Sequence, residues 1–217
     1  MIESKSPEAV LRRLVVPGQT AVVTMELQNG VVGEDALLPA LPVAVKARGM
    51  LDVAGNVCRA ARQHGMRVVH CTAESRPDGA GSAVNCRIFG LSEKRRLANG
   101  GGPTDHGTRG AQVVDELGED PSDIVVARIH GMSPFTSTSL DQILRNLGIR
   151  TIVLVGVSVN LGIFGAAMSA LDLGYQVVVV RDGVAGLPAE YAEAVLANSL
   201  SMIATIVTST ELFAAWA

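Results

Sequence analysis

The sequence predicts an α/β fold, a three-layer α/β/α sandwich with a mostly parallel sheet, and three observations support this. Short runs of Val and Ile recur along the chain, segments with helical character separate them, and glycines stand where those helices would end. Of the 217 residues 48% are hydrophobic and only 3% aromatic, which is typical of a compact core of Val, Ala, Leu and Ile. A chain of this length can bury a sheet between two helical layers, so we expect one domain over residues 1–217.

Six apolar segments are the predicted strands. Most are continuous runs of Val and Ile rather than alternations with polar residues, as expected of parallel strands covered on both faces. They are residues 20–27, 67–72, 123–127, 151–156, 176–180 and 205–207. Because helical segments separate them, they predict a six-stranded Rossmann-like sheet.

The predicted helices supply the crossovers that parallel strands require. They are residues 43–64, 138–147, 162–173 and 189–202, with a short turn ending near Trp216. Gly65, Gly148 and Gly174 each follow a helix and precede a strand, where a left-handed residue commonly closes the last turn. Residues 1–13 mix charges and lack the apolar centre of a secretory signal, which predicts a short surface helix or arm.

Composition argues against several classes of partner. The net charge is −3, with 18 basic and 21 acidic residues scattered along the chain, so we expect no nucleic-acid partner. The charge-free run 151–171 is as long as a membrane span, but it divides into a β-branched and a small-residue half, so we expect no membrane segment. The three cysteines are an odd number and show no metal-ligand spacing, so we expect a cytoplasmic protein without a metal site. We also expect no cofactor.

Residues 74–121 interrupt the strand and helix alternation. Gly, Asp, Asn, Pro and Arg dominate this segment, including the tract NGGGPTDHGTRG. We predict a long surface excursion, which is either an exposed loop without a role or a lid over the site.

Glu26 and Arg128 are the sharpest candidates for a site, because each lies at the end of an apolar strand. Ligands of open α/β sheets bind outside the carboxyl ends of the strands. A carboxylate there needs a partner, and a guanidinium is a natural one. The pair is either part of an active site or a structural ion pair.

Two stretches carry a family resemblance. TAVVTMELQN, and the long block from DIVVARIHGMSPF through GIRTIVLVGVSVNLGIFGAAMSALDLGYQVVVVRDG, resemble the isochorismatase-like (cysteine hydrolase) superfamily. Its amidases use an Asp, Lys and Cys triad, and the resemblance places Glu26, Arg128 and Gly162 at those positions. True isochorismatases also have Gly in the cysteine position. The resemblance therefore implies an isochorismatase-like hydrolase of a small carboxylated metabolite, a vinyl ether or a related compound, with Glu26 as acid and Arg128 as carboxylate anchor.

The resemblance also implies substrate-binding positions and a cis peptide. The peptide between Val157 and Ser158 would be cis, and the amides of Ser158 and Gly162 would form an anion cradle. The other implied substrate-binding residues are Gln28, Glu74 and Arg76. Cys71 is a weaker alternative nucleophile, and Cys58 is a core residue. His70 and His130 lack metal-ligand spacing and are interpreted as hydrogen-bonded structural residues.

Two alternatives to an enzyme stay open. Three substitutions at three catalytic positions favour a catalytically silent relative that binds a small molecule or a protein. A mainly structural component of an oligomer is also possible, with Phe213 to Trp216 at a subunit interface. The resemblance implies a homo-oligomer, a dimer or a tetramer, in any case.

Overall fold

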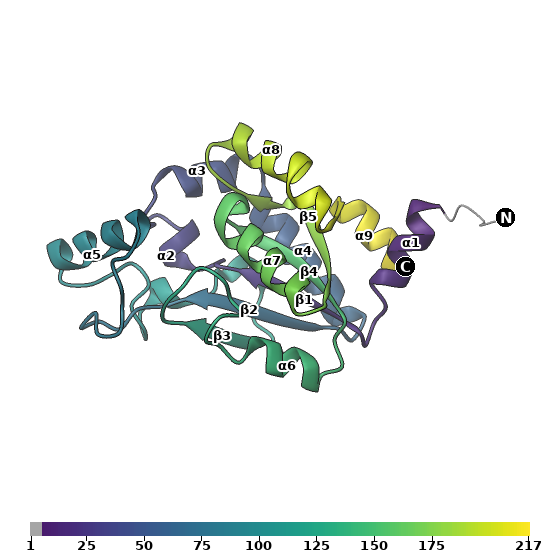
Figure 1. Ribbon diagram of the computed structural model, residues 1–217, viewed down its shortest axis with the longest axis horizontal. Helices are drawn as coiled ribbons and strands as arrows, with labels where there is room; N and C mark the ends of the chain where they lie inside the picture. The colour runs from purple at the N-terminus through teal and green to yellow at the C-terminus, as the bar shows by residue number, and fades with distance from the viewer. Residues whose placement is uncertain (1–5) are drawn as a thin grey trace.

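A central parallel sheet organises the protein, whose computed structural model describes residues 6–217. The strand order is β3-β2-β1-β4-β5-β6, and all neighbouring strands pair in parallel (Figure 1). The strands are β1 (Thr20–Met25), β2 (Arg67–Ala73), β3 (Ile124–Arg128), β4 (Thr151–Val157), β5 (Gln176–Ala185) and β6 (Thr205–Val207). The predicted fold class is confirmed. Residues 1–5 of the predicted N-terminal arm lie outside the described residues.

Helices cover both faces of the sheet. They are α1 (Pro7–Leu14), α2 (Asn29–Val32), α3 (Ala40–Ala47), α4 (Met50–Gln63), α5 (Arg87–Asn99), α6 (Leu140–Asn146), α7 (Phe164–Asp172), α8 (Ala189–Asn198) and α9 (Ser209–Trp216). Buried residues of α1, α3, α4 and α9 share one core with Val22, whereas those of α6, α7 and α8 share the other with Ala21 and Val23. The alternation follows from the two-residue period of a strand.

Three predicted helices differ in their bounds. Residues 43–64 form two helices, because Gly49 adopts a φ of +59° and breaks the run between α3 and α4. A turn of π-helix, Val159–Ile163, precedes α7, and α8 ends at Asn198 before a turn of 3₁₀-helix. The charge-free run 151–171 forms β4, this π turn and most of α7. Within residues 6–217 no helix has the length and hydropathy needed to cross a bilayer.

The excursion at residues 74–121 is ordered and contains a helix that sequence reasoning did not predict, α5. Asp105 fixes the loop after α5, because its carboxylate accepts hydrogen bonds from the Gly102 amide and the Ser75 hydroxyl, both at 2.7 Å. A Cβ atom at Gly30 or Gly110 would stand 1.9 or 1.8 Å from the carbonyl oxygen of Pro103. Both positions therefore need glycine so that the excursion can pack closely on α2.

The C-terminal helix α9 packs on its own chain. Trp216 is 6% exposed, and its ring centroid lies 6.1 Å from that of His64. The chain's own core thus buries the indole of Trp216, and the predicted subunit interface at Phe213 to Trp216 stays a prediction.

Candidate active site

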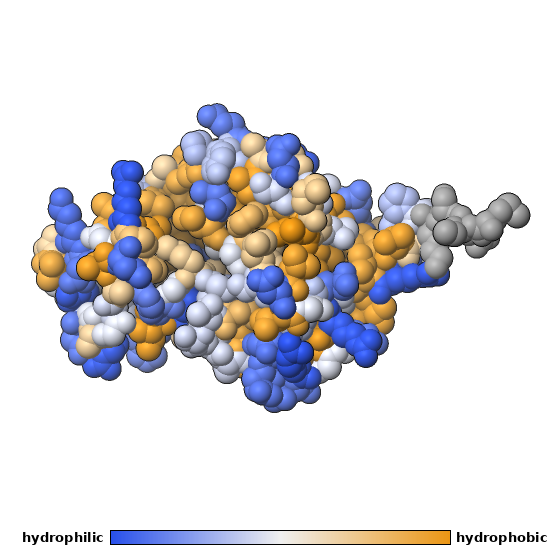
Figure 2. All heavy atoms as spheres, in the orientation of Figure 1, coloured by the Kyte–Doolittle hydropathy of each residue, from blue (hydrophilic) through white to orange (hydrophobic). Residues whose placement is uncertain are grey.

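A cavity of about 260 Å³ opens at the carboxyl ends of the central strands. Glu26 follows β1, Arg128 ends β3, and Gly162 follows β4, and all three line this cavity. The strand register explains why these three residues lie close together, since Met25 pairs with both Cys71 and Gly156 while Ala73 pairs with Arg128. The structure thus brings the three predicted catalytic positions to one place. In Figure 2 hydrophobic side chains gather around the hollow between the α5 end and the body of the molecule.

Glu26 turns the chain out of the sheet. Its φ is +53°, a left-handed conformation that is uncommon for a residue other than glycine. Its amide still donates to the carbonyl oxygen of Cys71 at 2.9 Å, so the sheet continues while the side chain leaves it. The side chain is 18% exposed. A non-glycine residue held this way often marks a functional position.

Arg128 forms the predicted ion pair with Glu26 through Nη2. Its Nε donates to the carbonyl oxygen of Gly131 at 2.6 Å. Its Nη1 is buried and has no hydrogen-bond partner among residues 6–217, although the side chain is only 4% exposed. An unpaired buried donor is costly to a fold, so a buried guanidinium that lines a cavity and retains one is suited to an incoming anion.

Gly162 leaves no room for a side chain. A Cβ there would lie 2.7 Å from the carbonyl oxygen of Val157 and 3.2 Å from the terminal carbon of Met25. The space that a nucleophilic side chain would need at this position is thus occupied by backbone and by the buried Met25. A cysteine could enter this position only if the surrounding chain moved.

The peptide bond between Val157 and Ser158 is cis, as the resemblance implied. The Ser158 hydroxyl donates to Oδ1 of Asn160 at 2.6 Å, and its carbonyl oxygen accepts from the amides of Leu161 and Ile163. Ser158 and Asn160 both line the cavity. The anion cradle of the Ser158 and Gly162 amides stays a prediction.

Glu74 also lines the cavity, and its side chain is only 10% exposed. One carboxylate oxygen accepts from the Thr72 hydroxyl at 3.2 Å, and the other lies 2.6 Å from Nδ1 of His106. The Glu74 amide donates to the carbonyl oxygen of Arg128 at 2.8 Å, so the two residues lie on neighbouring backbone.

Three predicted substrate-binding residues are not among the residues that line the cavity. Gln28 is fully buried and holds the end of β2, because its amide group donates to the carbonyl oxygens of Ala73 and Ala111 and accepts from the Ala73 amide. Arg76 is exposed and pairs with Asp78. Val157 is completely buried in the core beneath the site.

The cysteines are poor nucleophiles for this cavity, since none of the three is among the residues that line it. Burial raises the pKa of the Cys71 thiol to about 12, although nearby Arg128 opposes the shift. Burial likewise raises the pKa of the Cys58 thiol in α4 to about 12. Cys58 is a core residue, as predicted.

The two candidate histidines differ in position, since His70 lies within β2 and His130 follows β3. His70 is hydrogen-bonded, as predicted, because its ring nitrogens lie 2.8 Å from the Thr24 hydroxyl and 3.1 Å from Asp123. The structure also buries this side chain. Burial lowers the pKa of His70, and the Asp123 hydrogen bond opposes that shift. His130 is exposed, lines the cavity, and lies 5.2 Å from Phe89 between ring centroids. The hydrogen-bonded structural role expected of His130 stays a prediction.

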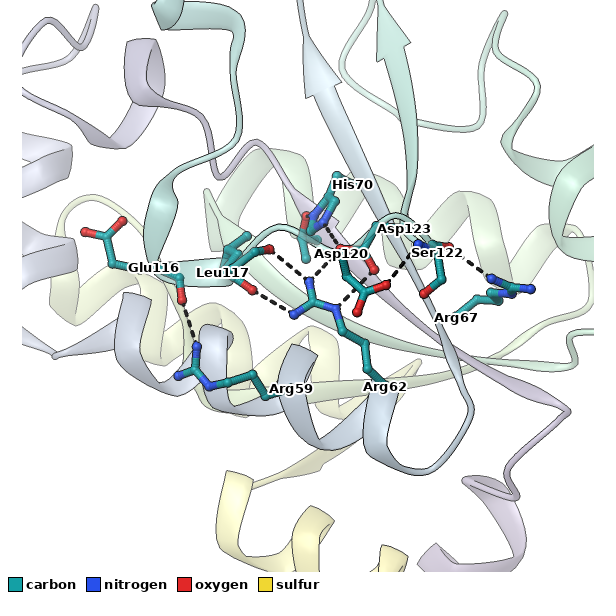
Figure 3. A network of polar contacts seen from close by, with 11 residues as sticks. Arg59, Arg62, Arg67, His70, Glu116, Leu117, Asp120, Ser122 and Asp123 are labelled. Carbon is teal, nitrogen blue, oxygen red and sulfur yellow. Dashed lines mark hydrogen bonds and ion pairs between the residues drawn. The ribbon is translucent and has the colours of Figure 1, made fainter.

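A polar network holds the far end of the excursion (Figure 3). Arg62 of α4 pairs with Asp123 through Nε and Nη2, at 3.1 and 2.5 Å. It also donates to the carbonyl oxygens of Leu117 and Gly118 at 2.9 and 3.1 Å. The network lies at the start of β3 and fastens residues 117–123 to α4.

Sequence reasoning missed the cavity wall that α5 provides. Its lining residues are Ile88, Phe89, Ser92, Glu93 and Arg96. Their spacing follows one face of a helix. That spacing is visible in the sequence, but the glycines and arginines around it led to an interpretation as a loop. Within residues 6–217 no three His, Cys, Asp or Glu side chains group closely enough to hold a metal ion.

Comparisons with known proteins agree on one group of relatives. A family profile described as an isochorismatase domain matches residues 20–211. A ureidoacrylate amidohydrolase of Pseudomonas savastanoi pv. phaseolicola is 30% identical over 191 residues, covering 82% of this chain and 75% of the relative. A protein of Arabidopsis thaliana described as a probable inactive nicotinamidase is 31% identical, covering 79% and 83%.

Solved structures show the same likeness. An isochorismatase family protein of Desulfovibrio vulgaris superposes with a TM-score of 0.76 at 29% identity, covering 89% of this chain and 96% of that one. The N-carbamoylsarcosine amidase of Thermoplasma acidophilum superposes with a TM-score of 0.65 at 26% identity, covering 88% and 96%.

Proposed function

The chain belongs to the isochorismatase-like hydrolase family, and from this premise we propose that it hydrolyses a small carboxylated molecule, a vinyl ether or a related compound, without a thiol. The observation that carries the proposal is the buried Nη1 of Arg128, which has no partner within residues 6–217 and belongs to a side chain that lines the cavity. A substrate carboxylate would accept a charge-assisted hydrogen bond from it.

A thioester route is closed at this site. Gly162 has no thiol, and Cys71 is buried outside the lining with its pKa raised to about 12. Thiolate attack on an amide therefore has no group to perform it. The activity named for the ureidoacrylate amidohydrolase is for this reason not the one proposed for this chain.

Glu26 would act as the acid after the substrate has bound. Without substrate, Glu26 forms an ion pair with Arg128. A substrate carboxylate on Nη1 places a second negative charge beside the same guanidinium, and two carboxylates in one site favour the uptake of one proton. Glu26 would then give that proton to the enol carbon of a vinyl ether. Water adds to the oxocarbenium ion and returns a proton, and the hemiketal breaks into a carbonyl compound and an alcohol.

A binding module without catalysis is the second candidate, because Glu26 is already engaged in an ion pair with Arg128. The relative described as a probable inactive nicotinamidase, at 31% identity, favours this candidate too. In that case the cavity would hold a carboxylated ligand without converting it.

One experiment separates the two candidates. A panel of carboxylated vinyl ethers would be incubated with the protein while formation of the carbonyl product is followed, alongside Glu26→Gln and the exposed control Glu190→Gln. We expect turnover that falls about 10²- to 10⁴-fold in Glu26→Gln, the usual contribution of a general acid, and is unchanged in Glu190→Gln. Full activity of Glu26→Gln on a converted substrate would refute the acid mechanism. Calorimetric binding of the same compounds without conversion would establish the binding module.

A further inference from the structure

We propose that the cavity selects a monocarboxylate with an uncharged, apolar body and rejects a ligand with a second anionic group. The inference rests on the proposed function in one respect, the use of Arg128 as the carboxylate anchor. Its evidence is the charge of the rest of the lining. Three carboxylates, of Glu26, Glu74 and Glu93, and two guanidinium groups, of Arg96 and Arg128, belong to it.

Arg96 is a weaker anchor than Arg128, because its side chain is 20% exposed against 4% and is therefore less shielded from water. Nε and Nη2 of Arg96 donate to the two carboxylate oxygens of Glu93 at 2.8 and 2.7 Å. Such a bidentate pair satisfies the carboxylate-binding edge of a guanidinium. Arg128 is therefore the lining cation with a buried donor left over.

Glu74 sets the second condition. Its carboxylate is mostly buried, and each oxygen has one protein partner, Thr72 or His106. A carboxylate can accept about four hydrogen bonds, so this carboxylate, which belongs to the lining, retains acceptor capacity. A second anionic group on the ligand would meet this carboxylate and be repelled, whereas an N–H or O–H group would find an acceptor.

The walls favour an apolar body. Their large apolar side chains include Leu37, Leu38, Leu41, Ile88, Phe89 and Leu187. A volume of about 260 Å³ lies just below the roughly 300–1,000 Å³ of pockets for drug-sized ligands, which indicates a ligand about the size of one substituted ring.

Calorimetric titration with benzoate, isophthalate and 3-aminobenzoate tests the inference. We expect benzoate to bind, isophthalate to bind at least about ten-fold more weakly because of like-charge repulsion, and 3-aminobenzoate to bind at least as tightly as benzoate. Glu74→Gln keeps an acceptor for the Thr72 hydroxyl. In this variant the affinities for benzoate and isophthalate should differ by about three-fold or less. Glu190→Gln makes the same charge change on the exposed surface of α8 and should leave the difference unchanged.

The outcomes separate the two proposals. Isophthalate that binds as tightly as benzoate, or a difference that Glu74→Gln does not narrow, would overturn the selectivity while leaving Arg128 as an anchor. Equal benzoate binding by the wild type and Arg128→Met, or no binding of any of the three acids, would overturn the anchor itself and the selectivity with it. Matching melting temperatures of the wild type and Glu74→Gln would show that the variant is folded.

Discussion

Two buried pairs of an arginine and a carboxylate lie at opposite ends of the strands of the sheet. They differ in whether the guanidinium group retains an N–H donor without a protein acceptor. Arg62 gives Nε, Nη1 and Nη2 to protein acceptors, two of them on Asp123 and the others on backbone carbonyls. Arg128 leaves Nη1 unpaired within the described chain and lines a cavity. The satisfied pair fastens segments together, whereas we propose that the pair with an unsatisfied donor receives a ligand.

Replacing each arginine in turn should have the largest expected effect, because one replacement should mainly lower stability and the other should mainly abolish ligand binding. Arg62→Met leaves Asp123 buried without its partner and should lower the free energy of unfolding by about 3–5 kcal/mol. Arg128→Met leaves Glu26 beside an open cavity, so we expect a smaller loss of stability together with loss of benzoate binding. Urea unfolding and calorimetry measure the two effects. Equal losses of stability would show that both pairs are structural.

Filling the cysteine position should have the next largest effect. Gly162→Ala places a Cβ 2.7 Å from the Val157 carbonyl oxygen and should destabilise the protein by about 1–3 kcal/mol, as overpacking does. Gly165→Ala is the matched control, because its Cβ would meet no atom within 4 Å. As an alanine on an open face of α7 it should be neutral or stabilise by up to about 1 kcal/mol. Comparable unfolding midpoints for the two variants would contradict the described packing.

Most of the fold could be predicted from the sequence, since continuous Val and Ile runs with intervening helical segments specify a covered parallel sheet. Glu26 and Arg128 were also predictable, because charged residues at the ends of apolar strands need partners. The break at Gly49 and helix α5 were not. The first depends on one left-handed glycine within an unbroken apolar pattern, and the second is a helix with no buried residue. The obstruction at Gly162 depends on the carbonyl oxygen of Val157 and on the side chain of Met25, which comes from another strand, so it requires the folded backbone to be known.

Between pH 7 and 5, the stability of the protein should depend on pH through His70, which lies at the Arg62 end of the sheet. Burial lowers the pKa of His70 in the folded protein, so the unfolded chain binds more protons than the folded one below the ordinary histidine pKa of about 6.5. The stability that His70 contributes should be fully present above that pH and be lost as pH falls through the lowered folded pKa. The slope of unfolding free energy against pH between 7 and 5 should therefore decrease in His70→Gln. An unchanged slope would show that groups other than His70 cause the pH dependence of stability in this range.

The smallest expected effect is on thiol chemistry. Cys86 is exposed, whereas Cys58 and Cys71 are buried with pKa values raised to about 12. A disulfide reagent at neutral pH should therefore titrate one thiol in the folded protein and three in denaturant, with benzoate binding by Cys86→Ser unchanged. A second thiol that reacts quickly in the folded protein would mean that the site opens to Cys71.

The most direct test of the account is a crystal structure of the protein with benzoate. We expect the benzoate carboxylate to lie within hydrogen-bonding distance of Nη1 of Arg128, with the ring against the α3 and α5 walls of the cavity. A benzoate held elsewhere, or an Arg128 Nη1 that bonds to the protein while the cavity stays without ligand, would contradict it.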